Sequence, residues 1–190
     1  YEMSFGSYPV YHKKDLEKLF KCKIIKKLGS GSFGIAYLLK GKTVLKVTTD
    51  VEEIEAIKRV TRLERKSGKE LTGLVKILVP PKKIGSSGAW NNSWGYIREY
   101  VKRPRGRRRE IGSEVAWDTL VSAADCIADC RKLPKNIVDS VIEAAKNGIR
   151  LADLGPRHVG KVGRHWKALH RTAEQGEAPV TLIPCWWHCN

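Results

Sequence analysis

The sequence lacks any apolar run of the roughly 18 residues that a helix needs to cross a bilayer. It also lacks the basic start and apolar stretch of a secretory signal, so we expect neither membrane contact nor export. Cysteines number only five, an odd count spread over the chain that does not fit a disulfide framework. These absences favour a reducing compartment, and the cytoplasm is the expected location.

Acidic residues are scarce, since 20 Asp and Glu accompany 36 Lys and Arg and leave a formal net charge of +16. Such an excess raises the local concentration of anionic partners such as nucleotides and nucleic acids. Much of it lies in the run Lys102–Arg109. This run predicts either a solvated loop or a non-specific nucleic-acid patch, because no aromatic side chains interleave it to stack on bases.

The most distinctive segment is a glycine-rich turn between two β-like runs. Its residues are Gly29, Ser30, Gly31, Ser32, Phe33 and Gly34. The G-x-G-x-x-G spacing also occurs in dinucleotide-binding folds, where the glycines open a helix. Here Ile35 to Leu39, a Lys40-Gly41-Lys42 turn and Thr43 to Val47 follow instead, which predicts a β-hairpin with a single lysine, Lys46, in its second strand.

A glycine flap over phosphates, followed by a strand lysine, is how a protein kinase holds ATP. The segment from Lys23 to Val47 resembles the N-terminal lobe of the protein-kinase fold. The resemblance implies an α+β, two-lobed architecture, with an antiparallel-sheet N-lobe over residues 1–101 and a truncated, mainly helical C-lobe over residues 102–190. It also implies that Gly29 to Gly34 cover the ATP phosphates and that Lys46 contacts the α- and β-phosphates. Small kinase-like proteins of this kind occur in bacteria and phages, so a phage-encoded chain would act in the host cytoplasm.

Two helices are expected in the first half of the chain, a short one at Lys13–Phe20 and a longer one at Val51–Lys66. On the longer helix, Glu53 and Glu64 fall among the apolar residues, where a carboxylate needs a partner. The kinase resemblance implies that this partner is Lys46. Glu53 is preferred because the connection from the strand is short, and Glu64 is the alternative.

Two further strands are expected, at Leu71–Val79 and Trp94–Val101, separated by a turn from Pro80 to Asn92. The second strand resembles the one that leads into the kinase hinge, where backbone groups bind adenine. The residues implied for this role are Glu99, Tyr100 and Val101.

Helices are expected at Ser113–Lys132 and Pro134–Asn147, with Gly148 as a C-terminal stop. The segment from Gly148 to Val159 resembles the kinase catalytic loop. The resemblance implies that Asp153 accepts the proton of the substrate hydroxyl and that His158 takes the place of the metal-binding Asn. The basic residues from Arg164 to Arg171 predict a solvated, amphipathic connector.

A kinase binds Mg²⁺ with a second carboxylate, which the D-F-G motif supplies at the end of the next hairpin. The candidate strand, Pro179–Trp186, contains no acid, and no Asp occurs after Asp153. ATP is therefore the expected cofactor, whereas Mg²⁺ would need other ligands, for which Glu174 and Glu177 are candidates. His158 is a candidate ligand for a softer metal.

Three functions fit these observations. The first is a kinase-like ATP-binding protein that transfers the γ-phosphate to a Ser or Thr hydroxyl of a protein substrate. The second is a catalytically inactive pseudokinase that acts as a binding module, which the missing metal-binding acid supports. The third is a basic nucleic-acid-associated protein in which the glycine turn is coincidental.

Overall fold

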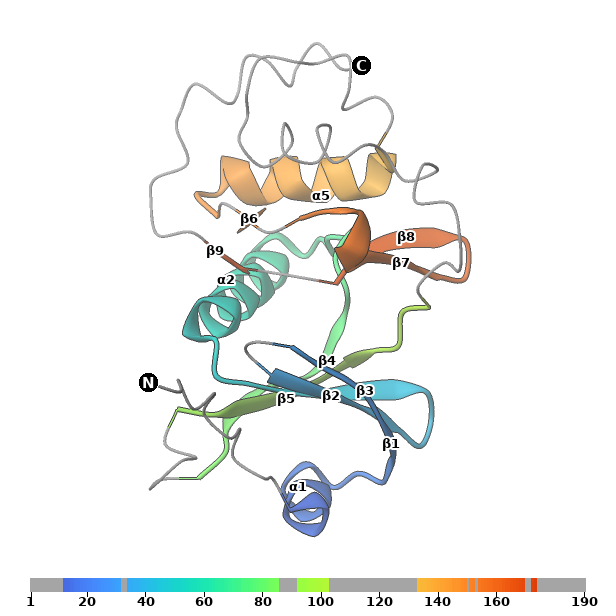
Figure 1. Ribbon diagram of the computed structural model, residues 1–190. Helices are drawn as coiled ribbons and strands as arrows, with labels where there is room; N and C mark the ends of the chain where they lie inside the picture. Colours follow the sequence, from blue (N-terminus) through green and yellow to red (C-terminus); the bar gives the residue numbers. More distant parts are fainter. Residues whose placement is uncertain are drawn as a thin grey trace, which may run out of the picture. The chain divides into compact units, whose positions relative to one another are not determined.

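The computed structural model describes residues 12–31, 34–85, 92–102, 133–149, 151–152, 154–169 and 172–173. It is a mixed α+β fold (Figure 1). The chain forms two compact units, one of Tyr1–Asp50 with Leu78–Arg98 and one of Val51–Ile77 with Glu99–Asn190. This division places the helix that starts at Val51 with the C-terminal residues, whereas the expected boundary near residue 102 groups it with the sheet.

The first unit is built on a five-stranded sheet in the order β1-β2-β3-β5-β4. The strands are β1 (Ile24–Gly31), β2 (Gly34–Leu39), β3 (Thr43–Thr48), β4 (Ile77–Lys83) and β5 (Trp94–Glu99). The pairs β1–β2 and β2–β3 are antiparallel, as the glycine turn and the Lys40-Gly41-Lys42 turn predict. Gly41, in the second turn, has a φ of +94°, a conformation that favours glycine.

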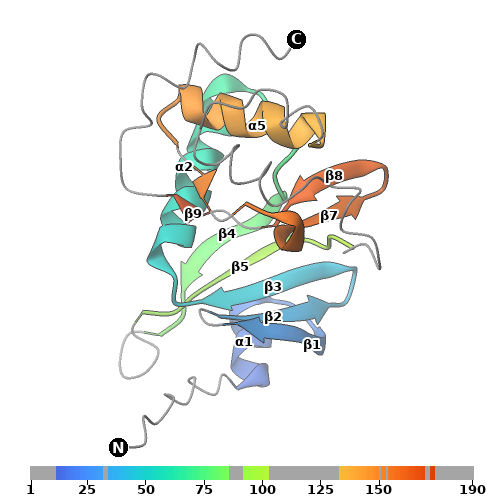
Figure 2. The ribbon, with the colours of Figure 1, turned by 45° about the horizontal axis from the view of Figure 1, so that its top comes forward.

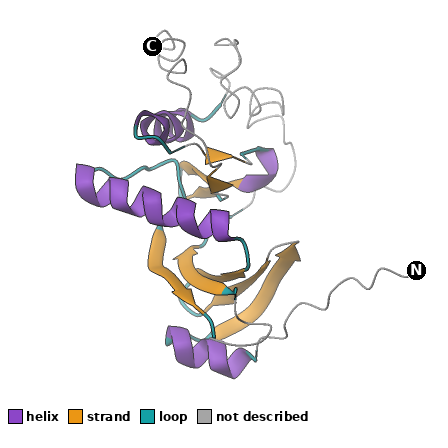
Figure 3. Cartoon of the chain, turned by 90° about the vertical axis from the view of Figure 1, so that its left-hand side faces the viewer, coloured by secondary structure: helices purple, strands orange, loops and turns teal. Residues whose placement is uncertain are grey.

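Helix α1 (Lys13–Phe20) has the expected bounds and packs on one face of this sheet (Figure 3). It buries Leu16 and Phe20 in a cluster with strand residues that include Leu45 and Val47. Gly95 in β5 admits the Phe20 ring, because a Cβ there would overlap it. Since successive side chains of a strand point to opposite faces, Leu45 and Val47 face α1 and Lys46 lies on the other face.

The expected strand Leu71–Val79 is displaced, because β4 starts at Ile77 and runs through Pro80 and Pro81. Strand β4 is at the edge of the sheet, where a proline without an N–H is tolerated. The apolar residues Leu71 and Leu74 are buried in the core of the second unit rather than in a strand.

The second unit combines helices with short antiparallel strand pairs (Figure 2). Its described elements are α2 (Val51–Ser67), α5 (Lys135–Lys146), β6 (Leu151–Ala152), the 3₁₀ turn η3 (Pro156–His158), β7 (Val159–Val162), β8 (His165–Ala168) and β9 (Thr172–Ala173). The expected helices at 51–66 and 134–147 are confirmed, and Gly148 ends α5 with a φ of +72°. The expected helix Ser113–Lys132 lies outside the described residues. No helix in the described part of the chain is long and apolar enough to span a bilayer.

A close contact fixes the segment before β4 against α5. The Gly73 N–H donates to Ser140 Oγ at 2.8 Å, and this hydroxyl donates to the Asn136 carbonyl at 2.9 Å. A Cβ at Gly73 would overlap the Asn136 carbonyl, so only glycine permits this approach. The core around it is apolar and includes Val60, Leu71, Leu74, Ile137, Val141, Ala144, Leu151 and Val159.

Strands β7 and β8 form a hairpin that the sequence interpretation missed. The connector expected across Arg164–Arg171 is in its described part a strand, and Lys167 is buried rather than solvated. The turn is Gly163-Arg164, with Gly163 at a φ of +59°, and Val162 pairs with His165. The Lys161 ammonium lies 4.4 Å from the centre of the Trp166 ring across the pair, which adds a cation–π contact.

Candidate functional site

The glycine turn is the end of the β1–β2 hairpin. The hairpin predicted after the glycines is β2–β3, so the prediction of strands rather than a helix there is confirmed. The last pairs of the ladder are Gly29 with Ala36, Ser30 with Ile35, and Gly31 with Gly34. The tip residues Ser32 and Phe33 lie outside the described residues.

The three glycines of the turn differ in whether packing requires a residue without a side chain. A Cβ at Gly34 would overlap the Val47 carbonyl oxygen of β3, so packing requires this glycine. By contrast, no described atom lies within 4 Å of a Cβ placed at Gly29 or Gly31, and neither has a positive φ. Both are exposed. The ladder has a bulge between Lys27 and Gly29, but neither packing nor a positive φ requires glycine at these two positions.

Lys46 lies in the same row of the sheet as Gly29. Ala36 pairs with Gly29 on one side and with Lys46 on the other, so the three positions cross three neighbouring strands. Lys46 is half-buried on the face away from α1. The fold therefore brings the glycine hairpin and the strand lysine, two parts of the expected site, onto one sheet.

The two candidate glutamates of α2 have different environments. Glu53 is in the first turn of the helix and is 1% exposed, as its place on the apolar face predicts. Glu64 Oε1 accepts the Leu71 N–H at 2.9 Å and so has a structural role at the end of the helix. The pairing of Lys46 with Glu53 stays a prediction.

Glu99, the first of the three expected hinge residues, is held by side chain and backbone. Its N–H donates to the Lys76 carbonyl at 3.0 Å, and its Oε1 accepts the Lys76 N–H at 2.8 Å. The same oxygen lies 2.9 Å from Lys167 Nζ on β8. Sequence reasoning did not find Lys167, because nothing local to that residue indicates burial.

The other two expected hinge residues, Tyr100 and Val101, lie between Glu99 and a second hydrogen-bonded residue, Lys102. Lys102 exchanges two backbone hydrogen bonds with Lys161 of β7, at 3.0 and 2.9 Å. Between the anchors, the backbone groups of Tyr100 and Val101 make no hydrogen bond to another described residue. Gly160 allows β7 to approach this segment, because a Cβ there would overlap a Val101 methyl group.

The expected catalytic loop is described only in part. Asp153 lies outside the described residues, as do Glu174, Glu177, the run 103–109 and the strand 179–186. His158 ends η3, donates its N–H to the Gly155 carbonyl at 2.9 Å and accepts the Leu169 N–H at 2.6 Å. The residues that the structure describes contain no group of three or more potential metal-ligating side chains.

The hairpin that follows this loop is β7–β8. It ends at Ala168, which lies before the expected strand Pro179–Trp186. After Ala168 the sequence reads Leu169, His170, Arg171 and Thr172, none of which carries a carboxylate. Mg²⁺ prefers oxygen ligands, and its kinase site needs an acid at the end of this hairpin. The four residues from Leu169 to Thr172 do not supply this acid.

No protein-family model matches the sequence, and no curated protein matches it. Among solved structures, the chain is similar to the kinase domain of PknI from Mycobacterium tuberculosis, which was crystallised as a point mutant. The TM-score is 0.47, the sequence identity is 14%, and the match covers 87% of this chain. The chain spans 62% of the length of that kinase domain.

Proposed function

We propose that this chain is a kinase-like nucleotide-binding protein in which the β1–β2 hairpin and Lys46 hold the phosphates of ATP. The observation that carries the proposal is the pair of exposed glycines, Gly29 and Gly31, for which neither packing nor φ accounts. Glycine weakens a strand, and a strand glycine marks either a bulge, as next to Gly29, or a place where a ligand approaches the backbone. We propose that both glycines serve ligand approach. Lys46, which lies in the same cross-strand row as Gly29, supplies the positive charge that a bound phosphate needs.

Phosphate binding at this place follows from ordinary electrostatics. A triphosphate is a polyanion whose oxygens accept hydrogen bonds from backbone N–H groups and from an ammonium group. Without Cβ atoms at Gly29 and Gly31, the phosphate oxygens reach the backbone of β1 directly. Lys46, on a strand rather than a loop, offers its charge from a fixed position. Glu53 is the proposed partner that would orient it.

The adenine would bind to the backbone of Tyr100 and Val101. An adenine edge offers one donor and one acceptor, so it needs one carbonyl and one N–H from the protein. The segment is anchored on one side by Glu99 and on the other by Lys102, so its backbone groups are pre-positioned. Pre-positioned groups lose little entropy on binding.

A specific observation favours the inactive form of this function, a binding module, over a phosphotransferase. None of the four residues directly after the β7–β8 hairpin, Leu169 to Thr172, carries a carboxylate that could serve as the second ligand of a catalytic Mg²⁺. We therefore propose that nucleotide binds without a requirement for Mg²⁺. Transfer to a protein hydroxyl, with Asp153 orienting the acceptor, is the alternative.

Isothermal titration with ATP, in the presence and absence of Mg²⁺, tests the proposal. Lys46→Ala removes a charge-assisted hydrogen bond and is expected to weaken ATP binding by about ten- to a hundredfold. Lys40→Ala removes the same charge from the exposed β2–β3 turn and serves as the matched control, with a change of less than about twofold.

The double variant Gly29→Ala/Gly31→Ala tests the hairpin itself. Because both sites have open space, the variant should be at least as stable to heat as the wild type, while its ATP affinity falls. Equal ATP affinity in the wild type, Lys46→Ala and the glycine variant would contradict the proposed phosphate site. Binding that requires Mg²⁺ would instead favour the phosphotransferase.

A further inference from the structure

A dense group of exposed lysines surrounds α1 and the start of β1. The lysines are Lys13, Lys14, Lys18, Lys21, Lys23, Lys26, Lys27, Lys40 and Lys42, and all are exposed. The acids within the same stretch of sequence, 13–42, are Asp15 and Glu17. Together these lysines are called the α1–β1 basic surface.

In the described part of the chain, one acid forms an ion pair with a lysine of this surface. Glu17 Oε1 lies 3.9 Å from Lys23 Nζ, but the same oxygen also accepts the Ile24 N–H at 2.8 Å. Among the described residues, the other lysines of the surface make no ion pair. Like charges at this density destabilise a fold, so the surface is suited to an anionic partner.

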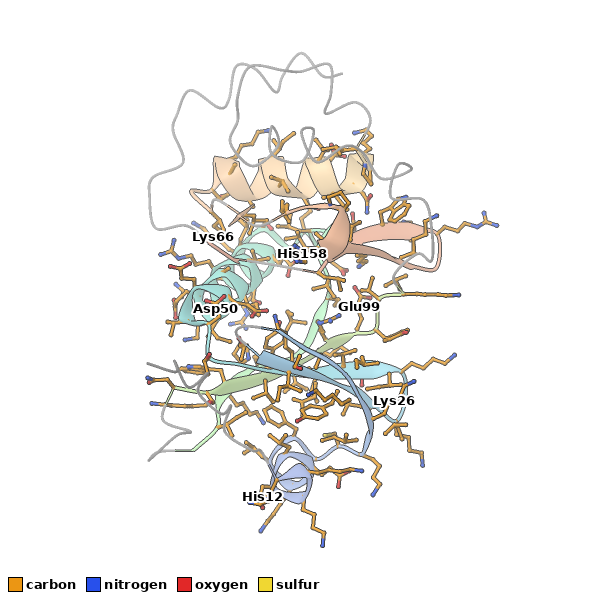
Figure 4. The ribbon with its side chains drawn as sticks, in the orientation of Figure 1. His12, Lys26, Asp50, Lys66, Glu99 and His158 are labelled. Carbon is orange, nitrogen blue, oxygen red and sulfur yellow. The ribbon has the colours of Figure 1, made fainter. Side chains whose placement is uncertain are left out.

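The elements of the surface are held together by backbone contacts. The Lys40 N–H donates to the Lys23 carbonyl at 2.9 Å, which places the β2–β3 turn beside the start of β1. The C-terminal residue of α1 leads through Lys21, in a left-handed conformation, directly into that strand. Figure 4 labels His12, the residue before α1, and Lys26 of β1 in this part of the molecule.

Apolar side chains are also exposed within the stretch 13–42 that carries these lysines. Leu19 on α1 is 40% exposed and Ile25 on β1 is 54% exposed. An aliphatic side chain flanked by lysines suits the boundary between lipid headgroups and acyl chains. A duplex offers little apolar surface, so the phosphates of nucleic acid would leave these side chains in water.

We propose that the α1–β1 basic surface binds peripherally to an anionic phospholipid bilayer. The stretch 13–42 contains no arginine, the residue that reads bases and phosphates with a bidentate fork. Its described aromatic residues, Phe20 and Tyr37, are buried or half-buried and do not form a base-stacking platform. Lysines act instead as point charges, which suffices for attraction to an anionic leaflet.

This proposal revises the expectation that the protein has no membrane contact. That expectation rests on the absence of a spanning helix, and a peripheral surface does not need one. The proposal does not depend on nucleotide binding, because it uses neither Lys46 nor the glycines.

Co-sedimentation of the full chain with vesicles tests the surface. Vesicles of phosphatidylcholine alone are compared with vesicles that contain phosphatidylserine at 30 mol%, on the order of an anionic leaflet. We expect binding to the anionic vesicles only, with a steep loss as salt rises, because screening shortens the range of the lysine charges.

Two charge-matched variants locate the binding. Lys13→Gln/Lys14→Gln/Lys18→Gln is expected to lose about fivefold in partitioning per lysine, on the order of a hundredfold in total. Lys66→Gln/Lys69→Gln/Lys146→Gln removes the same charge from exposed lysines elsewhere and keeps most of the binding. Leu19→Gln/Ile25→Gln weakens the binding that remains at high salt.

Three results would overturn the proposal. They are equal binding to neutral and anionic vesicles, equal losses in the two triple variants, and displacement from anionic vesicles by a short DNA duplex at equal phosphate concentration. The last result would assign the surface to nucleic acid.

Discussion

Lys167 Nζ lies 2.9 Å from Glu99 Oε1, and both side chains are largely buried, at 10% and 18% exposure. The same oxygen accepts the Lys76 N–H at 2.8 Å. This carboxylate thus joins β8 to the end of β5 and to the segment before β4. The conformation of the proposed adenine-binding residues, which follow Glu99, is therefore fixed by a side-chain ion pair as well as by backbone bonds.

Breaking this pair is expected to destabilise the protein. Lys167→Met leaves the Glu99 carboxylate without its cation, at a cost of about 3 kcal/mol in the free energy of unfolding. Lys167→Arg retains the charge and recovers most of the loss. Lys135→Met provides the control, because the Lys135–Asp139 pair is exposed and contributes less than about 0.5 kcal/mol. Urea unfolding measures all three, and similar losses for the two methionine variants would contradict a special role for Lys167.

Alanine substitutions at Gly34 and Gly31 of the β1–β2 hairpin should have opposite effects on the free energy of unfolding. Gly34→Ala forces a methyl group against the Val47 carbonyl and is expected to destabilise by about 2 kcal/mol or more. Gly31→Ala meets open space and should stabilise by roughly 0.5 kcal/mol, because alanine loses less backbone freedom. Thermal unfolding by circular dichroism distinguishes them. A destabilising Gly31→Ala would mean that packing, not a ligand, explains that glycine.

Ser140 should be important for the second unit. Ser140→Ala leaves the buried Gly73 N–H without its acceptor, with an expected cost of about 1–3 kcal/mol. Ser67→Ala removes an exposed hydroxyl that also accepts a backbone N–H, from Lys69, and should change stability by less than about 0.5 kcal/mol. Denaturant titration of both variants checks this difference. An effect of Ser140→Ala as small as that of Ser67→Ala would show that the hydrogen bond adds nothing.

The thiol of Cys22 should titrate at high pH. Burial, and to a smaller extent the Glu17 carboxylate, raise the pKa of Cys22 above its ordinary value of 9.0. Near and above pH 9.0 the unfolded chain loses this proton before the folded chain does, so the group lowers stability as pH rises. Alkylation of Cys22 against pH, followed by peptide mass spectrometry, should show a midpoint above that of the urea-unfolded chain.

Glu17→Gln serves as the control for this titration, because it removes the charge but keeps an acceptor for the Ile24 N–H. Its alkylation midpoint should fall toward, but not reach, that of the unfolded chain. Identical midpoints for folded and unfolded protein would contradict the raised pKa.

The parts of the fold that follow from local signals were predictable from sequence. The helix at 13–20, the helix that starts at Val51 and the stop at Gly148 each have short-range causes in periodicity, capping and glycine conformation. The glycine hairpin and the place of Lys46 in the next strand were equally local.

The errors concern residues whose environment is set by distant parts of the chain. Leu71 and Leu74 are buried in one core cluster with residues of α5. Apolar residues that pack in this way give the same sequence signal as a buried strand, so strand propensity alone did not separate the two. Lys167 is buried because Glu99 lies opposite it, and no pattern around Lys167 indicates that partner. The β7–β8 hairpin did have a local signal, the turn at Gly163 between Val162 and His165, which the basic composition of the segment obscured.

The two edge strands of the five-stranded sheet differ in their chemistry. In β4, the adjacent Pro80 and Pro81 remove one N–H donor from each side of the strand, and in β1, Lys26 and Lys27 place two adjacent charges. A strand that approaches β4 therefore finds one donor missing, and a second copy of this chain that approaches β1 meets lysines of like charge. The prolines of β4 and the lysines of β1 thus protect the sheet against edge-to-edge growth into fibrils, and conditions that neutralise the β1 lysines would remove half of that protection.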